Sequence, residues 1–196
     1  MIIMECKSLI NYYNEPNDEI IAGHSVCPIE NEHIDIFPSV VDRFFTRYYH
    51  IKPGRPKEVY MVLFHSNRVC LICLAPCHPI LSQNLNDIKI SYNIGNSDRS
   101  ANKVKGKGKK GGMALQPDST LAILTSDNVN YKVPSCIRSK LIEVNDKLPN
   151  KPELLGQEGD GYLAIVLPKP ENCEDIKTSL LTQEQFDAEN GNNNFK

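Results

Sequence analysis

The sequence lacks a strong excess of either charge. Its 196 residues include 22 lysines and arginines against 24 aspartates and glutamates, which gives a formal net charge of -2. Such a balance provides no general attraction to nucleic acid or to a membrane surface, so an electrostatic partner must be met by a local patch. Hydrophobic residues make up 40% of the chain, enough for a real core in one domain.

Long apolar runs and a regular cysteine framework are also missing. No stretch approaches the roughly 20 apolar residues that cross a bilayer, so we expect no membrane partner. The start of the chain, Met1 to Ile10, lacks the basic region and the sustained apolar run of a signal peptide. The seven cysteines have no framework spacing, which favours reduced thiols. These features predict a soluble intracellular protein.

No catalytic arrangement emerges from the sequence. An activated acid or base requires a protected site that shifts its pKa, whereas the paired carboxylates Glu174 and Asp175 lie in polar sequence. We therefore predict no catalytic residue, no small-molecule substrate and no enzymatic activity. None of the histidines lies beside a nucleophile and an orienting acid; they are His24, His33, His50, His65 and His78.

Two motifs resemble ligand sites but lack the context that these sites need. Cys70 and Cys73, followed by Cys77 and His78, have zinc-like spacing. The first two fall within a predicted strand, however, where residues three apart point to opposite faces, so buried thiols are expected. The glycines of Gly106–Gly111 match G-x-G-x-x-G, but no helix follows to receive a phosphate. We predict no metal and no cofactor.

Alternating and apolar runs predict a mainly β protein. Asn67 is expected to adopt the left-handed conformation in the first hairpin turn. The predicted strands are Val59–Phe64 paired with Val69–Leu74, Ile88–Ile94, Thr120–Thr125 paired with Val129–Val133, Lys140–Asn145, and Tyr162–Leu167.

Two helices are predicted, one at each end of the β region. Ser39–His50 begins at a good N-cap, Ser39, which Asp42 can answer, and its apolar residues recur with helical spacing. A short helix follows Thr182 by the same capping pattern. We expect a flexible extension over residues 1–37, a β domain over 38–168, and an acidic segment, short helix and disordered tail over 169–196.

The second half of the chain resembles the glycine-cleavage H-protein and its lipoyl-domain relatives. Val133-Pro-Ser, Leu141-Ile-Glu-Val-Asn and Gly161-Tyr-Leu carry this resemblance. It implies a barrel-sandwich hybrid fold with a single hybrid motif. Carrier domains of this type hold lipoate or biotin on a lysine at a hairpin tip. The corresponding tip here, residues 126–128, has no lysine, and Lys132 lies on the returning strand, so we predict no attached group.

A second resemblance, to the Abitram (Simiate) family of actin-binding transcription modulators, spans about residues 38–187. It implies binding of actin as monomer or filament, control of filament assembly and cell protrusions, and partners in transcription or splicing bodies. It also implies residence in nuclear speckles, the cytoplasm and actin-rich projections. No family motif assigns actin contacts to particular residues. The matching motifs are Ser39-Val-Val-Asp-Arg-Phe-Phe-Thr-Arg-Tyr-Tyr, His65-Ser-Asn-Arg-Val-Cys, His78-Pro-Ile-Leu, Asn102-Lys-Val, Leu141-Ile-Glu-Val-Asn, Gly161-Tyr with Val166-Leu-Pro, and Leu180-Leu-Thr-Gln.

One local concentration of positive charge stands out. It consists of Lys103, Lys105, Lys107, Lys109 and Lys110. One interpretation is a solvated flexible loop. Another is a landing site for an acidic surface such as that of actin, or for nucleic-acid phosphate. A nuclear import signal is a further interpretation. The lysines have no interleaved aromatic residues, which weakens the case for single-strand binding. We take these lysines as the candidate actin-binding residues, with a lipoyl-carrier relative and a nucleic-acid adaptor as the alternative functions.

Overall fold

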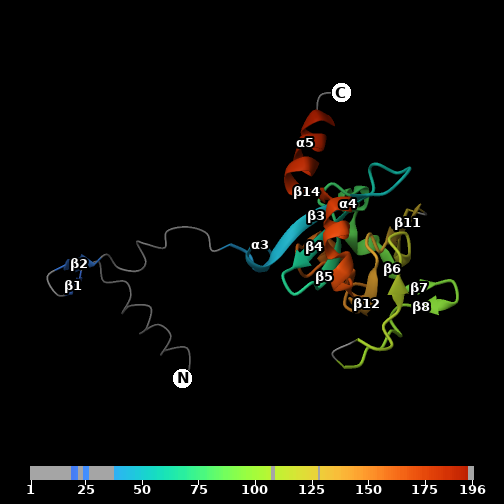
Figure 1. The fold of residues 1–196 in the computed structure, drawn as a ribbon. Coiled ribbons are helices and arrows are strands. Elements are labelled where there is room, and N and C mark those ends of the chain that lie inside the picture. The colour runs from blue at the N-terminus through green and yellow to red at the C-terminus, as the bar shows by residue number, and fades with distance from the viewer. Residues whose placement is uncertain (1–18, 22–23, 27–37, 107–108, 128, 194–196) are drawn as a thin grey trace, which may run out of the picture. The chain divides into compact units, whose positions relative to one another are not determined.

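The computed structural model describes residues 19–21, 24–26, 38–106, 109–127 and 129–193 (Figure 1). The chain divides into two units, residues 1–38 and residues 39–196. In the first unit, β1 (Glu19–Ile21) pairs antiparallel with β2 (His24–Val26). The rest of the predicted N-terminal extension and residues 194–196 of the predicted tail lie outside the described residues.

A seven-stranded sheet forms the main part of the second unit, in the order β14-β3-β4-β5-β13-β12-β9. All its neighbouring strands run antiparallel. The predicted hairpin of Val59–Phe64 with Val69–Leu74 is confirmed as β4 and β5. The strands are β3 (Phe45–Ile51), β4 (Val59–His65), β5 (Cys70–Leu74), β9 (Ala114–Leu115), β12 (Ser139–Val144), β13 (Ala164–Leu167) and β14 (Leu181–Thr182).

A smaller sheet has the order β11-β10-β6, with β6 at Lys89–Ser91, β10 at Thr120–Ser126 and β11 at Val129–Pro134. The predicted strand Ile88–Ile94 is interrupted, because β7 (Asn93–Ile94) leaves this sheet to pair with β8 (Ser97–Asp98). Four 3₁₀ turns occur in the described part of the chain, at Pro79–Ser82, Leu85–Asp87, Pro152–Gly156 and Pro170–Asn172.

The core consists of two apolar clusters, one on each face of the β4–β5 pair. Alternate residues of β4 enter different clusters: Tyr60 and Val62 join one, whereas Met61 and Leu63 join the other. Both faces of β4 are therefore covered, which explains its nearly unbroken apolar sequence. The first cluster lies against residues of the smaller sheet such as Leu124, so the two sheets share one interior.

The predicted helix Ser39–His50 is wrong over its second half. The Ser39–Asp42 capping box is present, but helix α3 spans only Val40–Phe44, and β3 begins at Phe45. The run from Phe45 to Ile51 is rich in aromatic residues and pairs along its whole length with β4. This sheet pairing outweighs the local helical pattern, as tertiary context commonly does.

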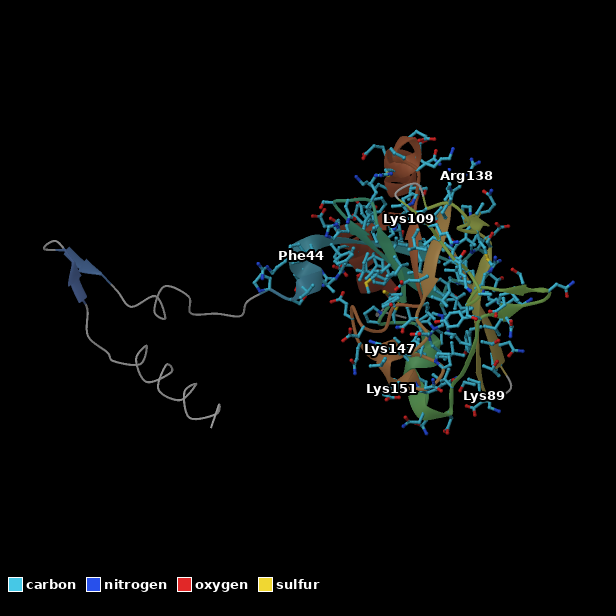
Figure 2. The ribbon with its side chains drawn as sticks, turned by 90° about the horizontal axis from the view of Figure 1, so that it is seen from below. Phe44, Lys89, Lys109, Arg138, Lys147 and Lys151 are labelled. Atoms are coloured by element: carbon cyan, nitrogen blue, oxygen red, sulfur yellow. The ribbon has the colours of Figure 1, made fainter. Side chains whose placement is uncertain are left out.

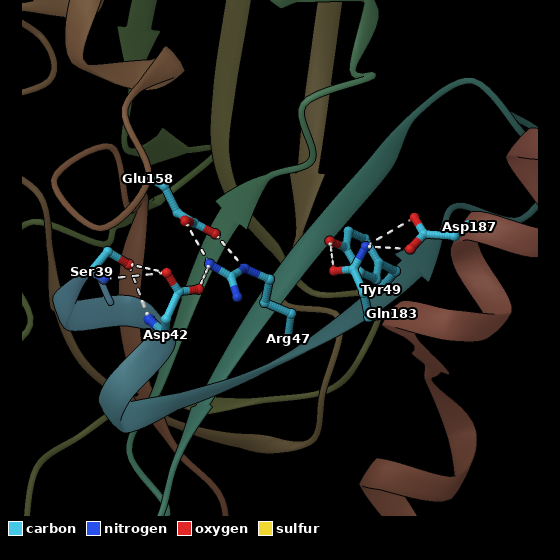
Figure 3. A network of polar contacts seen from close by, with 7 residues as sticks. All are labelled: Ser39, Asp42, Arg47, Tyr49, Glu158, Gln183 and Asp187. Carbon is cyan, nitrogen blue, oxygen red and sulfur yellow. Dashed lines mark hydrogen bonds and ion pairs between the residues drawn. The ribbon is translucent and has the colours of Figure 1, made fainter. Parts of the chain in front are cut away.

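Arg47 consequently points into an ion-pair network and does not form the basic patch with Arg43 that a longer helix would have produced. Its guanidinium bonds Glu158 at 2.6 and 2.8 Å and Asp42 at 2.6 Å (Figure 3). These bonds raise the pKa of Arg47. Asp42 therefore links the first turn of α3 to β3, and Glu158 links both to the segment after the third 3₁₀ turn.

The C-terminal segment packs on the same unit through two helices. Helix α4 (Cys173–Ser179), which the sequence did not predict, buries Ile176 in the first core cluster. Helix α5 (Gln183–Asn193) starts with the predicted capping pattern, since Thr182 and Gln185 exchange backbone-to-side-chain bonds. Phe186 stacks on Tyr49 with ring centroids 3.9 Å apart. None of the helices in the described part of the chain has the length and hydrophobicity needed to cross a bilayer.

Candidate functional site

The five predicted lysines fall within residues 103–110, which we call the lysine hairpin, and the structure describes four of them. Lys105 and Lys110 exchange both backbone hydrogen bonds, at 2.9 and 3.0 Å. Gly106 then accepts a bond from the Lys109 N–H and closes the turn. Lys107 lies outside the described residues. The described part of the segment therefore has one pair of ladder bonds, between Lys105 and Lys110.

The root of the lysine hairpin is held by the side chain of Asn102. Its Nδ2 donates to the carbonyls of Leu141 and Ile142, at 3.0 and 2.9 Å, and its Oδ1 accepts from the Met113 N–H at 3.0 Å. The two carbonyls belong to β12 beside the register shift that follows Leu141. One amide thus joins both sides of the hairpin base to the main sheet.

Two glycines bring the returning chain close to this root. Gly111 has a φ of +86°, and a Cβ there would lie 2.7 Å from the carbonyl oxygen of Lys103. At Gly112 a Cβ would lie 2.9 Å from the carbonyl oxygen of Leu141. Both positions therefore require the absence of a side chain, the first for its backbone conformation as well. These glycines shape the hairpin base; they do not form a phosphate loop.

The lysine side chains are available to a partner. Lys103, Lys105 and Lys110 are exposed, and Lys109, which Figure 2 labels, is half-buried. None of these four forms an ion pair with any residue that the structure describes. The four positive charges are therefore uncompensated at close range and produce a local positive potential in a chain of nearly neutral net charge.

The hairpin that the sequence predicts as the counterpart of a carrier arm is formed by β10 and β11. Ser126 pairs with Val129, so Asp127 and residue 128 form its tip, and Asp127 has a φ of 47°. Lys132 lies on the returning strand opposite Ile123, as predicted. The chain places an acidic side chain at the tip and no amine. This tip therefore lacks the group that carrier chemistry acylates.

The cysteine spacing does not produce a shared ligand set. Cys70 and Cys73 are both buried but belong to different core clusters, which confirms that they point to opposite faces of β5. Burial raises the pKa of Cys73 to about 12, so the thiol stays protonated at neutral pH. Among the described residues, no three His, Cys, Asp or Glu side chains gather as a metal site. These thiols behave as small apolar groups.

Two histidines have structural roles. His65 accepts the Asn67 N–H at 3.1 Å within the β4–β5 turn. The left-handed residue of the turn is Arg68, with a φ of 73°, so its prediction at Asn67 is wrong. Asn67 instead uses its side chain to accept the Val69 N–H. His78 is fully buried and accepts the Ile80 N–H, a role that sequence reasoning missed.

Asn102 is the other residue of the site that sequence reasoning missed. The motif Asn102-Lys-Val was noted only as part of a resemblance. Its bonds reach β12, 39 and 40 positions away in the chain, so no local spacing identifies them. The pair Gly111-Gly112 is the nearest local signal, because adjacent glycines permit unusual backbone conformations, but it does not show which segment the backbone approaches.

Comparisons with known proteins agree on family and fold. A family model described as "Glycine cleavage H-protein" matches residues 95–192. "Protein Abitram" of Drosophila melanogaster is 58% identical over 179 residues, which cover 90% of this chain and 81% of that protein. "Protein Abitram" of Homo sapiens is 43% identical over 159 residues, covering 78% and 87% respectively. These identities are high enough to establish kinship along most of the chain.

A solved structure supports the fold independently. The glycine cleavage system H protein from Mycobacterium marinum superposes with a TM-score of 0.50 and covers 74% of this chain and 97% of that chain. The sequence identity is 13%, so this likeness concerns the fold alone. The predicted mainly β, H-protein-like architecture is confirmed, and the sheets of the described residues do not close into a barrel.

Proposed function

Since the chain belongs to the Abitram family and has an H-protein-like fold, we propose that it is a non-catalytic actin-binding protein. In this proposal it modulates actin filament assembly and the growth of cell protrusions. It works by surface contact and not by carrying a covalently bound group. The lysine hairpin is the surface that meets actin.

The observation that carries this proposal is the state of the lysines. Lys103, Lys105 and Lys110 are exposed, they have no ion-pair partner among the described residues, and their hairpin is tied to the main sheet. A positive cluster held in one place loses less conformational freedom on binding than a flexible loop would lose. It also increases the rate of encounter with an acidic surface. Actin presents a surface of that kind.

The part of the proposal that excludes a covalently carried group is supported by the β10–β11 hairpin. A carrier domain needs an amine at the tip of its arm, and the tip here has Asp127. This hairpin therefore has no amine at its tip that a lipoyl or biotinyl group could acylate. A role in the nucleus, in speckles and with transcription or splicing partners, is proposed beside the cytoplasmic role and uses the same positive surface.

Co-sedimentation with filamentous actin tests the proposal, beside a monomer-binding assay, each at two salt concentrations. The test variant replaces Lys103, Lys105, Lys107, Lys109 and Lys110 by glutamate. We expect wild-type protein to bind and the variant to lose most of its binding, because attraction becomes repulsion. Binding should also weaken with salt, since exposed charges are screened within about 10 Å at 0.1 M.

A matched variant controls for charge in general. Lys89, Lys147 and Lys151 are exposed lysines outside the lysine hairpin (Figure 2), and their replacement by glutamate should leave actin binding nearly unchanged. Equal losses in both variants would remove the hairpin from the proposal. Wild-type protein that ignores both forms of actin would remove the function. Binding to RNA with a steep salt dependence, in the absence of actin binding, would instead identify a nucleic-acid adaptor.

A further inference from the structure

A cleft of about 500 Å³ lies away from the lysine hairpin, between the outer edge of β11 and the turn that joins β3 to β4. Its size is in the usual range for ligand pockets. Three prolines give it apolar walls, and cationic and amide side chains are placed among them. The lining residues are His50, Lys52, Pro53, Arg55, Pro117, Asp118, Thr120, Asn130, Lys132 and Pro134.

The edge of β11 supplies backbone groups to this cleft. β11 is the outermost strand of the smaller sheet. Because Ser126 and Val129 flank a two-residue turn, they form a hydrogen-bonded pair, and the next pair, Thr125 with Asn130, does not. Asn130 and Lys132 therefore direct their N–H and C=O groups away from β10. Such an edge is a template for another extended chain.

One hydrogen bond at this edge supports the outward direction of the Lys132 backbone. The Lys52 Nζ donates to the carbonyl oxygen of Lys132 at 2.7 Å, from the side of the β3–β4 turn. Thr125 and Asn130 lie opposite each other without backbone hydrogen bonds, and the Asn130 side chain accepts a bond from the Thr125 hydroxyl at 2.6 Å. Lys52 thus bridges the cleft at one point, and the Asn130 backbone and the Lys132 N–H remain directed toward it.

The accessible charge of the cleft is mainly positive. Glu58 is buried beneath it and uses both carboxylate oxygens, one with Lys52 at 2.6 Å and one with Arg55 at 2.7 Å. Burial raises the pKa of Glu58, but the bonds from Arg55 and Lys52 outweigh burial and keep this pKa below its usual range. Arg55 keeps unused donors and is more than half exposed, and Lys132 is exposed. Asp118 is the acidic lining residue that a ligand can reach.

We propose that this cleft binds an extended acidic peptide segment of a partner protein. The segment adds to the edge of β11 through the backbone of Asn130 and directs its carboxylates to Arg55 and Lys132. Its alternate apolar side chains pack on the prolines of the cleft. Backbone pairing supplies affinity and the cations supply the preference for acidic sequences, as in other strand-addition sites. The site is separate from the lysine hairpin and does not depend on actin binding.

Fluorescence anisotropy of a short fluorescein-labelled peptide of alternating glutamate and valine, with the full chain, tests this site. We expect binding of this peptide and little binding of its lysine–valine counterpart. Lys132→Glu should weaken binding about tenfold, the effect of losing one charge-assisted contact. Asn130→Pro should weaken it by a similar factor, because proline removes the outward N–H without removing a ladder bond. Lys89→Glu, at an exposed position on β6, is the matched control and should bind as wild type.

Several outcomes would overturn the site. Full binding by both Lys132→Glu and Asn130→Pro would place the peptide elsewhere. Loss of binding in the lysine-hairpin variant, with Lys132→Glu unaffected, would assign the peptide to that hairpin. Displacement of the peptide by single-stranded RNA would identify the cleft as a nucleic-acid site. The actin assay is independent of all these results, so failure here and failure of the proposed function can be told apart.

Discussion

Two hairpins of this molecule differ in what holds them and in what they present. The β10–β11 hairpin is held by a long antiparallel ladder, which has one register shift between Thr120 and Ala122, and by apolar residues such as Leu124 and Val133, which are fully buried. Among its described residues, the lysine hairpin has one pair of ladder bonds, and the Asn102 side chain holds its base. The β10–β11 hairpin has an aspartate at its tip, whereas the lysine hairpin presents the cluster of lysine side chains.

The comparison shows that the β10–β11 tip and the exposed lysines belong to two different hairpins of this fold. The hairpin that is best placed to carry a reactive amine has none, and the lysines are gathered on a segment held by hydrogen bonds. A polar root has few alternative partners, so a single substitution should release it. An apolar root is spread over many contacts and should respond instead to changes that introduce charge into the core. The two hairpins can therefore be disturbed separately.

The largest effect is expected from Asn102→Asp. A carboxylate cannot donate to the carbonyls of Leu141 and Ile142, and its charge lies against both carbonyl dipoles. We expect the free energy of unfolding to fall by about 3 kcal/mol. Urea denaturation measures this loss, and amide hydrogen exchange should show faster exchange at Lys105 and Lys110 than in wild type.

Asn102→Ala serves as the milder comparison. It removes the same donors without adding a charge, and we expect a loss of about 2 kcal/mol. Exchange in β10 and β11 should change little in both variants. If Asn102→Asp accelerated exchange equally in both hairpins, the two roots would not be independent, and the contrast between them would fail.

Acidification should cause a smaller loss of stability, and this loss should affect the β10–β11 hairpin. Burial lowers the pKa of His78 to about 4, and its ring lies 5.3 Å from that of Tyr60 and 5.5 Å from that of Tyr131 on β11. Between the unfolded pKa near 6.5 and the folded value, the unfolded chain binds the extra proton. Stability therefore falls as pH falls through this window, by about 2 kcal/mol at pH 5.

Denaturation curves at several pH values measure this dependence. His78→Gln keeps an acceptor for the Ile80 N–H and removes the titrating group, so the part of the slope due to His78 should disappear. The protection factor of the Tyr131 amide against hydrogen exchange should fall in acid more than that of the Lys110 amide. A wild-type stability that is flat between pH 7 and pH 5 would contradict the assignment of a neutral buried imidazole.

The smallest expected effect is no effect. Wild-type protein made in a lipoylating cell should have the mass of its unmodified chain, because the arm that would carry lipoate ends in Asp127. Intact mass spectrometry measures this, with Asp127→Lys as the variant that places an amine at the tip. A lipoyl or biotinyl adduct on the wild-type chain, at Lys132 above all, would contradict this expectation.

Much of the β architecture could be predicted from the sequence, because its signals are local. The alternation in β12 and the apolar runs of β4 and β5 identify strands, and Thr182 identifies the start of α5. The β3 strand could not be predicted, because the capping box at Ser39 and the spacing of Phe44 and Phe45 are local patterns that favour a helix. Only pairing with β4 decides the conformation of residues 45–51.

The candidate site was predicted in charge but not in geometry. The spacing of the lysines in the sequence identifies them as a cluster. The Asn102 side chain that anchors them, however, bonds carbonyls far along the chain. The cleft beside β11 could not be predicted either, because it exists only where the β3–β4 turn approaches a strand from another sheet. Lys52 and Lys132 meet there although 80 positions separate them. Such pairs depend on the tertiary fold, which no periodicity reports.

The ends of the main sheet have a consequence for self-association. Its outermost strands, β14 and β9, are two residues long each. So short a strand offers little backbone to a second copy, which disfavours end-to-end growth of the sheet into oligomers or fibrils. A protein that is to remain dispersed at high local concentration, as beside a polymer with many binding sites, benefits from edges of this kind.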